Sequence, residues 1–211
     1  GWVNGTNGDR ITGDTGWSDA AYTDDVYYFG SWEDGSMKTG WQKITVYDDD
    51  SGKEDDYDYW FNFKSNGKLR KHANEDDTWK SNGKYYHFDQ RGVMVYQWYK
   101  TTSSNTTTPS DWAYFNSPED GARMTKGWFK VVAPIEDNTF LENTDTFASG
   151  DSRDENERWY YAESKGELAY GKIKKIKGKY YGFFPDGHNK AGAMLTGLCA
   201  LEVDKNGDIV N

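Results

Sequence analysis

The chain has 211 residues, with 25 basic and 35 acidic side chains and a formal net charge of −10. This acidic balance argues against a nucleic-acid partner, because phosphates require a basic surface. No apolar run approaches the roughly 20 residues of a membrane-spanning helix, so no membrane insertion is expected. Aromatic residues nevertheless make up 17 % of the chain. We therefore expect a folded protein whose core consists mainly of rings.

Aromatic clusters recur along the sequence, and each has the length and composition of a short β-strand. A glycine turn such as EDG, SNG or QRG follows, and a second short strand then carries Met or Leu before a Gly-Trp pair begins the next unit. In chain order the clusters are VYYF (26–29), YWFNF (59–63), KYYHF (84–88), WAYF (112–115), WYYA (159–162) and KYYGFF (179–184). They predict about six β-hairpins, with a shortened seventh in CALEVDKNGDIVN (199–211).

The segments that begin at the turn glycines share a pattern in which a methionine follows the glycine two residues later, as in GSMKTGW (35–41), GVMVYQW (92–98) and GAMLTGL (192–198). Recurrence at a period of about 20–45 residues indicates a repeat protein. An isolated hairpin is marginal in water, so the units must stack and bury their rings against neighbours. We predict an all-β fold, an elongated solenoid of stacked short β-hairpins that forms a single module over residues 1–211. Because the chain opens inside a repeat, it is expected to be a fragment of a larger protein.

Three segments break the period, at 45–58, 99–111 and 134–158. Loops of this length are usually functional or mobile, and each is expected to extend a hairpin sideways. The acidic run DDDSGKEDD resembles a calcium loop, but with Gly52 at loop position six, Tyr47 takes the first position, where Asp is required. A single cysteine excludes CxxC sites, and the histidines lack a recurring partner. We predict no catalysis, no metal and no cofactor.

The joint pattern GW–(W/K)YYF–DG–(S/A)M–TGW resembles the cell-wall-binding repeats of secreted Gram-positive proteins, which are also called choline-binding or glucan-binding repeats. The similarity runs from Gly16 to about Leu201, outside the three inserts. It implies a secreted or cell-surface module that anchors a larger protein through aromatic grooves between hairpins. The implied partner is a cell-wall polymer or glycan, either a glucan or a choline-bearing teichoic acid.

In choline-binding members the resemblance implies a cage of the Gly-Trp tryptophan, the tryptophan that opens WYYF, a methionine, and a tyrosine from the next hairpin. Transferred to this chain, Trp98, Trp112 and Met124 form the only full set, with Tyr160 or Tyr161 following. The other sets are incomplete. Trp17 and Met37 are present in the first, but Val26 replaces its second tryptophan, and in the next Trp41 faces a rearranged YWF with Leu69. In the set of Trp128 and Trp159, Leu168 replaces the methionine, and Tyr180 or Tyr181 follows. The predicted ligand-binding residues are Trp17, Met37, Trp41, Trp98, Trp112, Met124, Trp128, Trp159, Tyr161 and Tyr181.

Three functions remain open at this point. A ring cage suits a quaternary ammonium such as choline, which cannot donate hydrogen bonds. Sugars use rings differently, by stacking on them, and the lysine before YY is more typical of the glucan-binding branch, which favours a glycan. The third alternative is a structural spacer or adhesive stalk in which the rings are simply core.

Overall fold

The structure is a computed structural model, and it describes residues 1–48, 55–72, 78–102, 107–135, 138–140, 145–150 and 154–210. The chain divides into two compact units. Unit 1 comprises Gly1–Val95 and Ser117–Gly121, and unit 2 comprises Tyr96–Asn116 and Ala122–Asn211.

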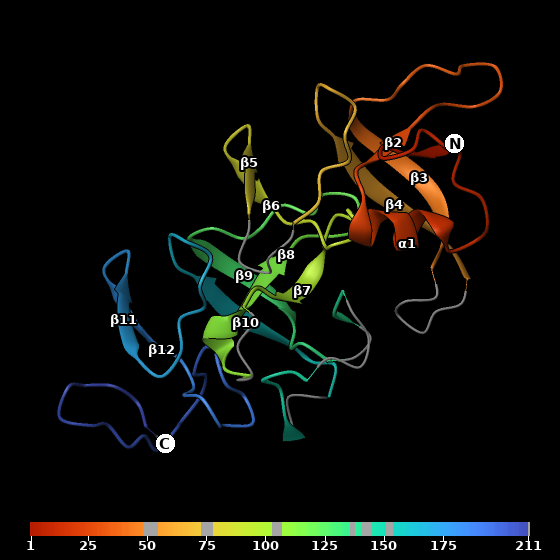
Figure 1. The fold of residues 1–211 in the computed structure, drawn as a ribbon. Helices are drawn as coiled ribbons and strands as arrows, with labels where there is room; N and C mark the ends of the chain where they lie inside the picture. Colours follow the sequence, from red (N-terminus) through yellow and green to blue (C-terminus); the bar gives the residue numbers. More distant parts are fainter. Residues whose placement is uncertain are drawn as a thin grey trace. The chain divides into compact units, whose positions relative to one another are not determined.

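Unit 1 contains three antiparallel two-stranded sheets, which pair β1 with β2, β3 with β4, and β5 with β6 (Figure 1). The described part of the 45–58 insert lengthens β3 and β4, which pair from Gly40↔Phe63 to Asp48↔Asp55. Residues 49–54, which carry most of the calcium-like run, lie outside the described residues. The elements of unit 1 are β1 (Trp2–Asn4), α1 (Gly16–Thr23), β2 (Val26–Tyr28), β3 (Gly40–Asp48), β4 (Asp55–Phe63), β5 (Trp79–Ser81) and β6 (Lys84–Tyr86).

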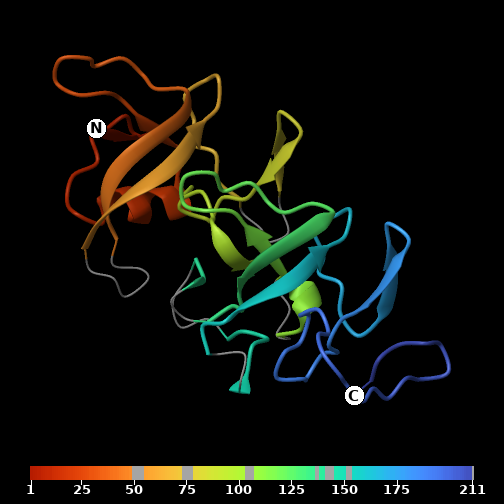
Figure 2. The ribbon, with the colours of Figure 1, turned by 180° about the vertical axis from the view of Figure 1, so that it is seen from behind.

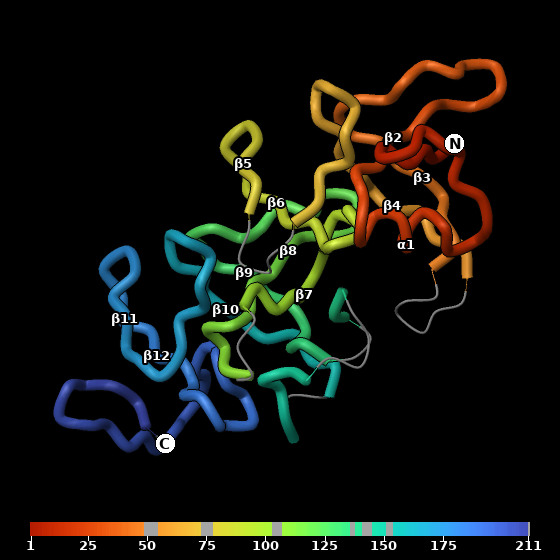
Figure 3. Tube along the Cα trace, viewed as in Figure 1, coloured from red at the N-terminus to blue at the C-terminus, as the bar shows by residue number. Residues whose placement is uncertain are grey.

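Unit 2 repeats this organisation, with β7 paired to β8, β9 to β10, and β11 to β12, all antiparallel. The short β11–β12 hairpin and its tight turn are easily followed along the Cα trace (Figure 3). The elements of unit 2 are β7 (Gln97–Lys100), the 3-10 helix η1 (Pro109–Asp111), β8 (Trp112–Phe115), β9 (Gly127–Val132), β10 (Glu157–Ala162), β11 (Ile173–Ile176) and β12 (Lys179–Gly182).

The structure confirms the predicted all-β class and its short stacked hairpins. The short second strand expected after the turn of each sequence repeat is reduced to one β-bridge, as between Phe88 and Met94 or between Phe183 and Met194. The stacking of the repeats explains why glycine recurs at the turn. Gly92 has a φ of +86°, and a Cβ there would lie 2.6 Å from the Leu69 side chain of the preceding repeat. Only glycine satisfies both the turn and the close contact.

One short helix lies where a Gly-Trp pair was expected to begin a hairpin repeat. The segment GWSDAAYT forms α1, which lies beside the β3–β4 hairpin (Figures 1 and 2). Trp17 and Ala21 stand four residues apart on one face of this helix, and both are buried. The indole Nε1 of Trp17 donates a hydrogen bond to the carbonyl of Tyr47 at 3.0 Å. This buried face holds the segment in a helix.

Candidate functional site

One arrangement of side chains recurs on three hairpins. The first strand carries a tryptophan and, two residues later, a lysine that pairs with a second tryptophan on the opposite strand. Residues two apart on a strand share a face, and paired residues share it too, so the two tryptophans are diagonal neighbours. The three sets are Trp41, Lys43 and Trp60 on β3–β4, Trp98, Lys100 and Trp112 on β7–β8, and Trp128, Lys130 and Trp159 on β9–β10.

The two tryptophans of the first set, Trp41 and Trp60, line an open pocket of about 260 Å³ in unit 1. The rings of Trp41 and Trp60 meet edge to face, with centroids 6.4 Å apart and planes at 84°. Tyr86 from the next hairpin lies 5.1 Å from Trp41 at 62°. Met94 closes the pocket, and its backbone N–H donates to the carbonyl of Trp60 at 2.9 Å. We call Trp41, Trp60, Tyr86 and Met94 the first cage.

Two carboxylates also line the pocket of the first cage, those of Glu119 and Asp120. Glu119 accepts hydrogen bonds from Lys43 Nζ at 2.6 Å and from the indole of Trp60 at 3.1 Å. These bonds, that of Lys43 above all, lower the pKa of Glu119. The carboxylate therefore stays ionised beside the rings, where it is paired with Lys43. Asp120 pairs with Lys84 at 3.4 Å.

The second cage has the same geometry in unit 2 and consists of Trp128, Trp159, Tyr181 and Met194. Trp128 and Trp159 are 6.3 Å apart at 87°, and Trp128 and Tyr181 are 4.8 Å apart at 66°. The backbone N–H of Met194 donates to the carbonyl of Trp159 at 2.8 Å, as that of Met94 does to Trp60. Trp159 is 42 % exposed, so much of its ring surface is accessible. Tyr161, also a predicted ligand residue, is buried 5.1 Å from Trp128.

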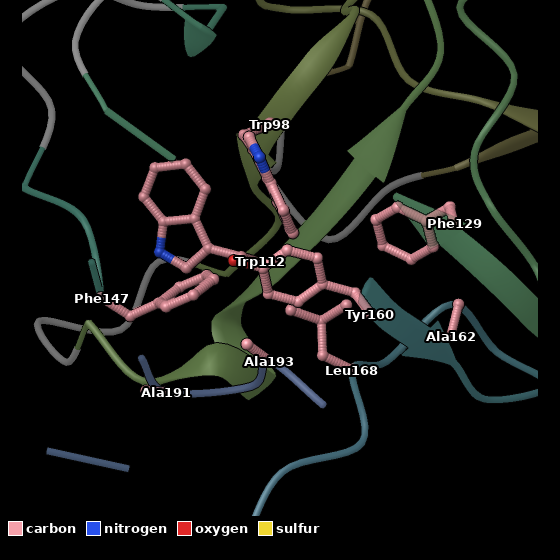
Figure 4. Packing of buried hydrophobic residues seen from close by; sticks show 9 residues of the cluster. All are labelled: Trp98, Trp112, Phe129, Phe147, Tyr160, Ala162, Leu168, Ala191 and Ala193. Atoms are coloured by element: carbon pink, nitrogen blue, oxygen red, sulfur yellow. The ribbon is translucent and has the colours of Figure 1, made fainter. Parts of the chain in front are cut away.

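The third set is filled instead of open. Trp98 and Trp112 are 0 % and 1 % exposed, and they pack with Tyr160 and Leu168 in one buried cluster (Figure 4). Phe147, from the 134–158 insert, lies against both indoles. Met124 packs on the outside of this cluster. The structure therefore places the set expected to be the full ligand groove in the core, because an inserted ring occupies the space. We call Trp98, Trp112, Tyr160 and Leu168 the closed cage.

The first hairpin brings no open cage together around its predicted residues. Trp17 is 3 % exposed and packs on Trp2 and Phe61. Met37 is 40 % exposed and lies over Gly67, where any Cβ would overlap its thioether.

Four residues of the two open cages were not predicted: Trp60, Tyr86, Met94 and Met194. Sequence reasoning took the methionine from the same hairpin as the tryptophans. In the structure it follows the next hairpin and bonds back to the preceding tryptophan's carbonyl. The signal for Trp60 was present in the strand register, because pairing the nine-residue strands β3 and β4 puts Trp60 opposite Lys43.

No family model and no curated protein matches the chain. Among solved structures, it is similar to choline binding protein F from Streptococcus pneumoniae, with 19 % identity, a TM-score of 0.40, and coverage of 89 % of this chain and 55 % of that one. It is also similar to the modular autolysin LytC from Streptococcus pneumoniae in complex with a synthetic peptidoglycan ligand, with 18 % identity, a TM-score of 0.41, and coverage of 88 % and 36 %. The multimodular pneumococcal cell wall endolysin from phage Cp-1, complexed with choline, is 16 % identical with a TM-score of 0.35, and coverage is 88 % and 36 %. The chain thus spans about half the length of the first protein and about a third of the others.

Proposed function

We propose that the chain is a non-catalytic, cell-surface or secreted binding module that holds choline groups of a cell-wall polymer in the first and second cages. The observation that supports this most is the repeated geometry of two accessible tryptophans, a tyrosine and a methionine. A quaternary ammonium cannot donate hydrogen bonds, so ring faces are its best partners, at about 0.5–2 kcal/mol per contact. The methionine adds soft, polarisable packing.

The steep angles between the rings favour a compact cation over a sugar as the ligand. In the first cage Trp60 and Tyr86 stand at 84° and 62° to Trp41, so the rings form walls around a small volume instead of one flat platform. Glu119 and Asp120 bring carboxylates, the groups that attract a cation, to the pocket, although each is paired with a lysine, Lys43 and Lys84 respectively. A glycan is the second candidate, supported by the exposed ring of Trp159, on which a sugar can stack.

The described residues offer no set of groups suited to catalysis by a metal. Among them, no three His, Cys, Asp or Glu side chains are grouped to hold an ion. His72 and His87 do come together, with ring centroids 4.8 Å apart, but His72 Nδ1 accepts a hydrogen bond from the Phe88 backbone.

In the same described part of the chain, no helix is long and apolar enough to span a membrane.

Removing one tryptophan from each open cage tests the proposal. Titration calorimetry with choline should find two sites on the unchanged chain, and Trp60→Ala and Trp159→Ala should each weaken one site by about 1–3 kcal/mol, the range for a buried aromatic contact. Trp32→Ala is the control, because Trp32 is 95 % exposed and lies outside both cages. If choline binding is absent while dextran or starch binds, the glycan candidate replaces this proposal.

Glu119 should make the first cage sensitive to salt and pH. Glu119→Gln is expected to weaken choline binding there a few-fold at pH 7 and low salt, and the difference should shrink as salt screens the exposed carboxylate. Because the pKa of Glu119 is lowered, its charge persists through mildly acidic pH and is lost only as the pH falls through that lowered value. The two proteins should therefore converge only in acid. Glu33→Gln, an exposed carboxylate elsewhere in unit 1, should have no such effect.

A further inference from the structure

The closed cage matches the open cages in its two tryptophans and its tyrosine, and Leu168 takes the position of their methionine. Trp98, Lys100 and Trp112 have the same strand register as Trp41, Lys43 and Trp60. Tyr160 lies 5.2 Å from Trp98 at 79°, as Tyr86 lies beside Trp41. Leu168 bridges to Ala162, just as Met94 bridges to Phe88.

The difference lies in what fills the space beside the two tryptophans. In the open cages the tryptophans contact each other edge to face at 6.4 and 6.3 Å. In the closed cage Phe147 contacts both, at 5.6 Å and 86° from Trp98 and at 6.1 Å and 78° from Trp112. Figure 4 shows the Phe147 ring beside the Trp112 indole within the cluster. Phe147 comes from the 134–158 insert and belongs to none of the hairpin strands.

Trp112 shows that this packing leaves a polar group unsatisfied. Its indole Nε1 is buried and has no acceptor among the described residues. Buried polar groups of a purely structural core are normally paired, and an unpaired donor costs stability. A phenylalanine at this position would avoid that cost, so packing alone does not account for the indole.

At the first hairpin, too, an aromatic ring from outside the hairpin strands fills the space beside the cage residues. Trp2 and Phe61 lie 5.2 Å apart at 73°, and Leu69 donates its N–H to the carbonyl of Val26 at 2.8 Å. This is the arrangement of the open cages, with Val26, Phe61 and Leu69 in place of the second tryptophan, the tyrosine and the methionine. Trp17, from α1, fills the space at 5.8 Å from Trp2 and 5.5 Å from Phe61. At both filled positions an aromatic side chain from outside the hairpin strands packs against the rings of the cage.

We propose that Trp98, Trp112, Tyr160 and Leu168 form a latent third cation site, which Phe147 occupies as an internal substitute for a quaternary ammonium ligand. The inference rests on the proposed function of the open cages. The insert thereby sets how many cations the chain can hold.

Phe147→Ala tests the proposal, with tetramethylammonium as the probe. Titration calorimetry should find one more site on the variant than on the unchanged chain, and adding Trp112→Ala to the variant should remove that extra site. Phe140→Ala is the matched control, because Phe140 is another buried phenylalanine of the same insert but packs on Tyr96 and Tyr99. It should leave the number of sites unchanged. A folded Phe147→Ala chain with the original number of sites overturns the proposal.

If Phe147→Ala is too unstable for calorimetry, its unfolding can be followed at a series of tetramethylammonium concentrations. Ligands that bind only the folded state stabilise it, and the slope of the logarithm of the folding constant against that of the free cation gives the number bound. One more cation than for the unchanged chain supports the latent site, and an equal number overturns it. If the unchanged chain itself binds no cation, the proposed function fails instead, so the two failures are distinguishable.

Discussion

Trp112→Ala should lower the free energy of unfolding by about 3–5 kcal/mol, the usual cost of emptying a buried aromatic site. Trp112 is 1 % exposed and packs against Phe147 in the core of unit 2. Urea unfolding followed by circular dichroism gives the change directly. The loss should be smaller than for a fully satisfied ring, because the variant also removes an indole N–H that has no acceptor among the described residues.

Trp159→Ala is the matched control, because Trp159 has the same strand register opposite Lys130 that Trp112 has opposite Lys100. Its ring is 42 % exposed, so its removal should cost far less stability. The assignment of Trp112 to the core is contradicted if both variants unfold at the same urea concentration as the unchanged chain.

The hairpin fold could be predicted from sequence because its signals are local. Aromatic strands, glycine turns and the Met or Leu that follows them recur at fixed spacing, and each part forms within a few residues of the next. The recurring glycine carries further information, since Gly92 adopts a positive φ and also leaves room for the Leu69 side chain of the preceding repeat. A period in the sequence therefore reports both a turn and a stacking contact.

The open and closed cages could not be told apart in the same way. The sequence makes Trp98 and Trp112 look like the better site, because they match the repeat most closely. Whether that site is open depends on Phe147, which lies 35 residues after Trp112 in an aperiodic insert. Trp17 has the same effect on Trp2 by forming a helix. Contacts made by inserts have no period, so the repeat cannot predict them.

A buried charge network in unit 1 was also invisible in the sequence. Arg91 is 2 % exposed and donates to Asp48 at 2.7 Å and to Asp89 at 3.0 Å. Asp48 also accepts a hydrogen bond from the hydroxyl of Tyr59 at 2.6 Å, and the Arg91 guanidinium lies 5.6 Å from the Trp17 ring. The network joins the end of β3 to the turn after β6 and to α1. It thus fixes the helix whose tryptophan fills the first hairpin.

Arg91→Ala should therefore destabilise the protein by about 3–5 kcal/mol, because it removes the cation that bonds to the buried carboxylates of Asp48 and Asp89. Burial raises the pKa of Asp89, and Arg91 opposes that rise. Without Arg91 the folded-state pKa of Asp89 should rise further above its unfolded value. When a carboxyl pKa is raised in the folded state, the folded protein binds the proton at a higher pH than the unfolded chain does. The loss of stability is therefore largest at neutral pH and is relieved as the pH falls through the raised pKa. Urea unfolding at several pH values should show the variant approaching the unchanged chain in acid. Lys38→Ala, which breaks only the surface pair with Asp34, should leave the transition where it was. A pH-independent gap would mean that lost packing, and not the loss of the Arg91 charge beside the buried carboxylates, causes the destabilisation.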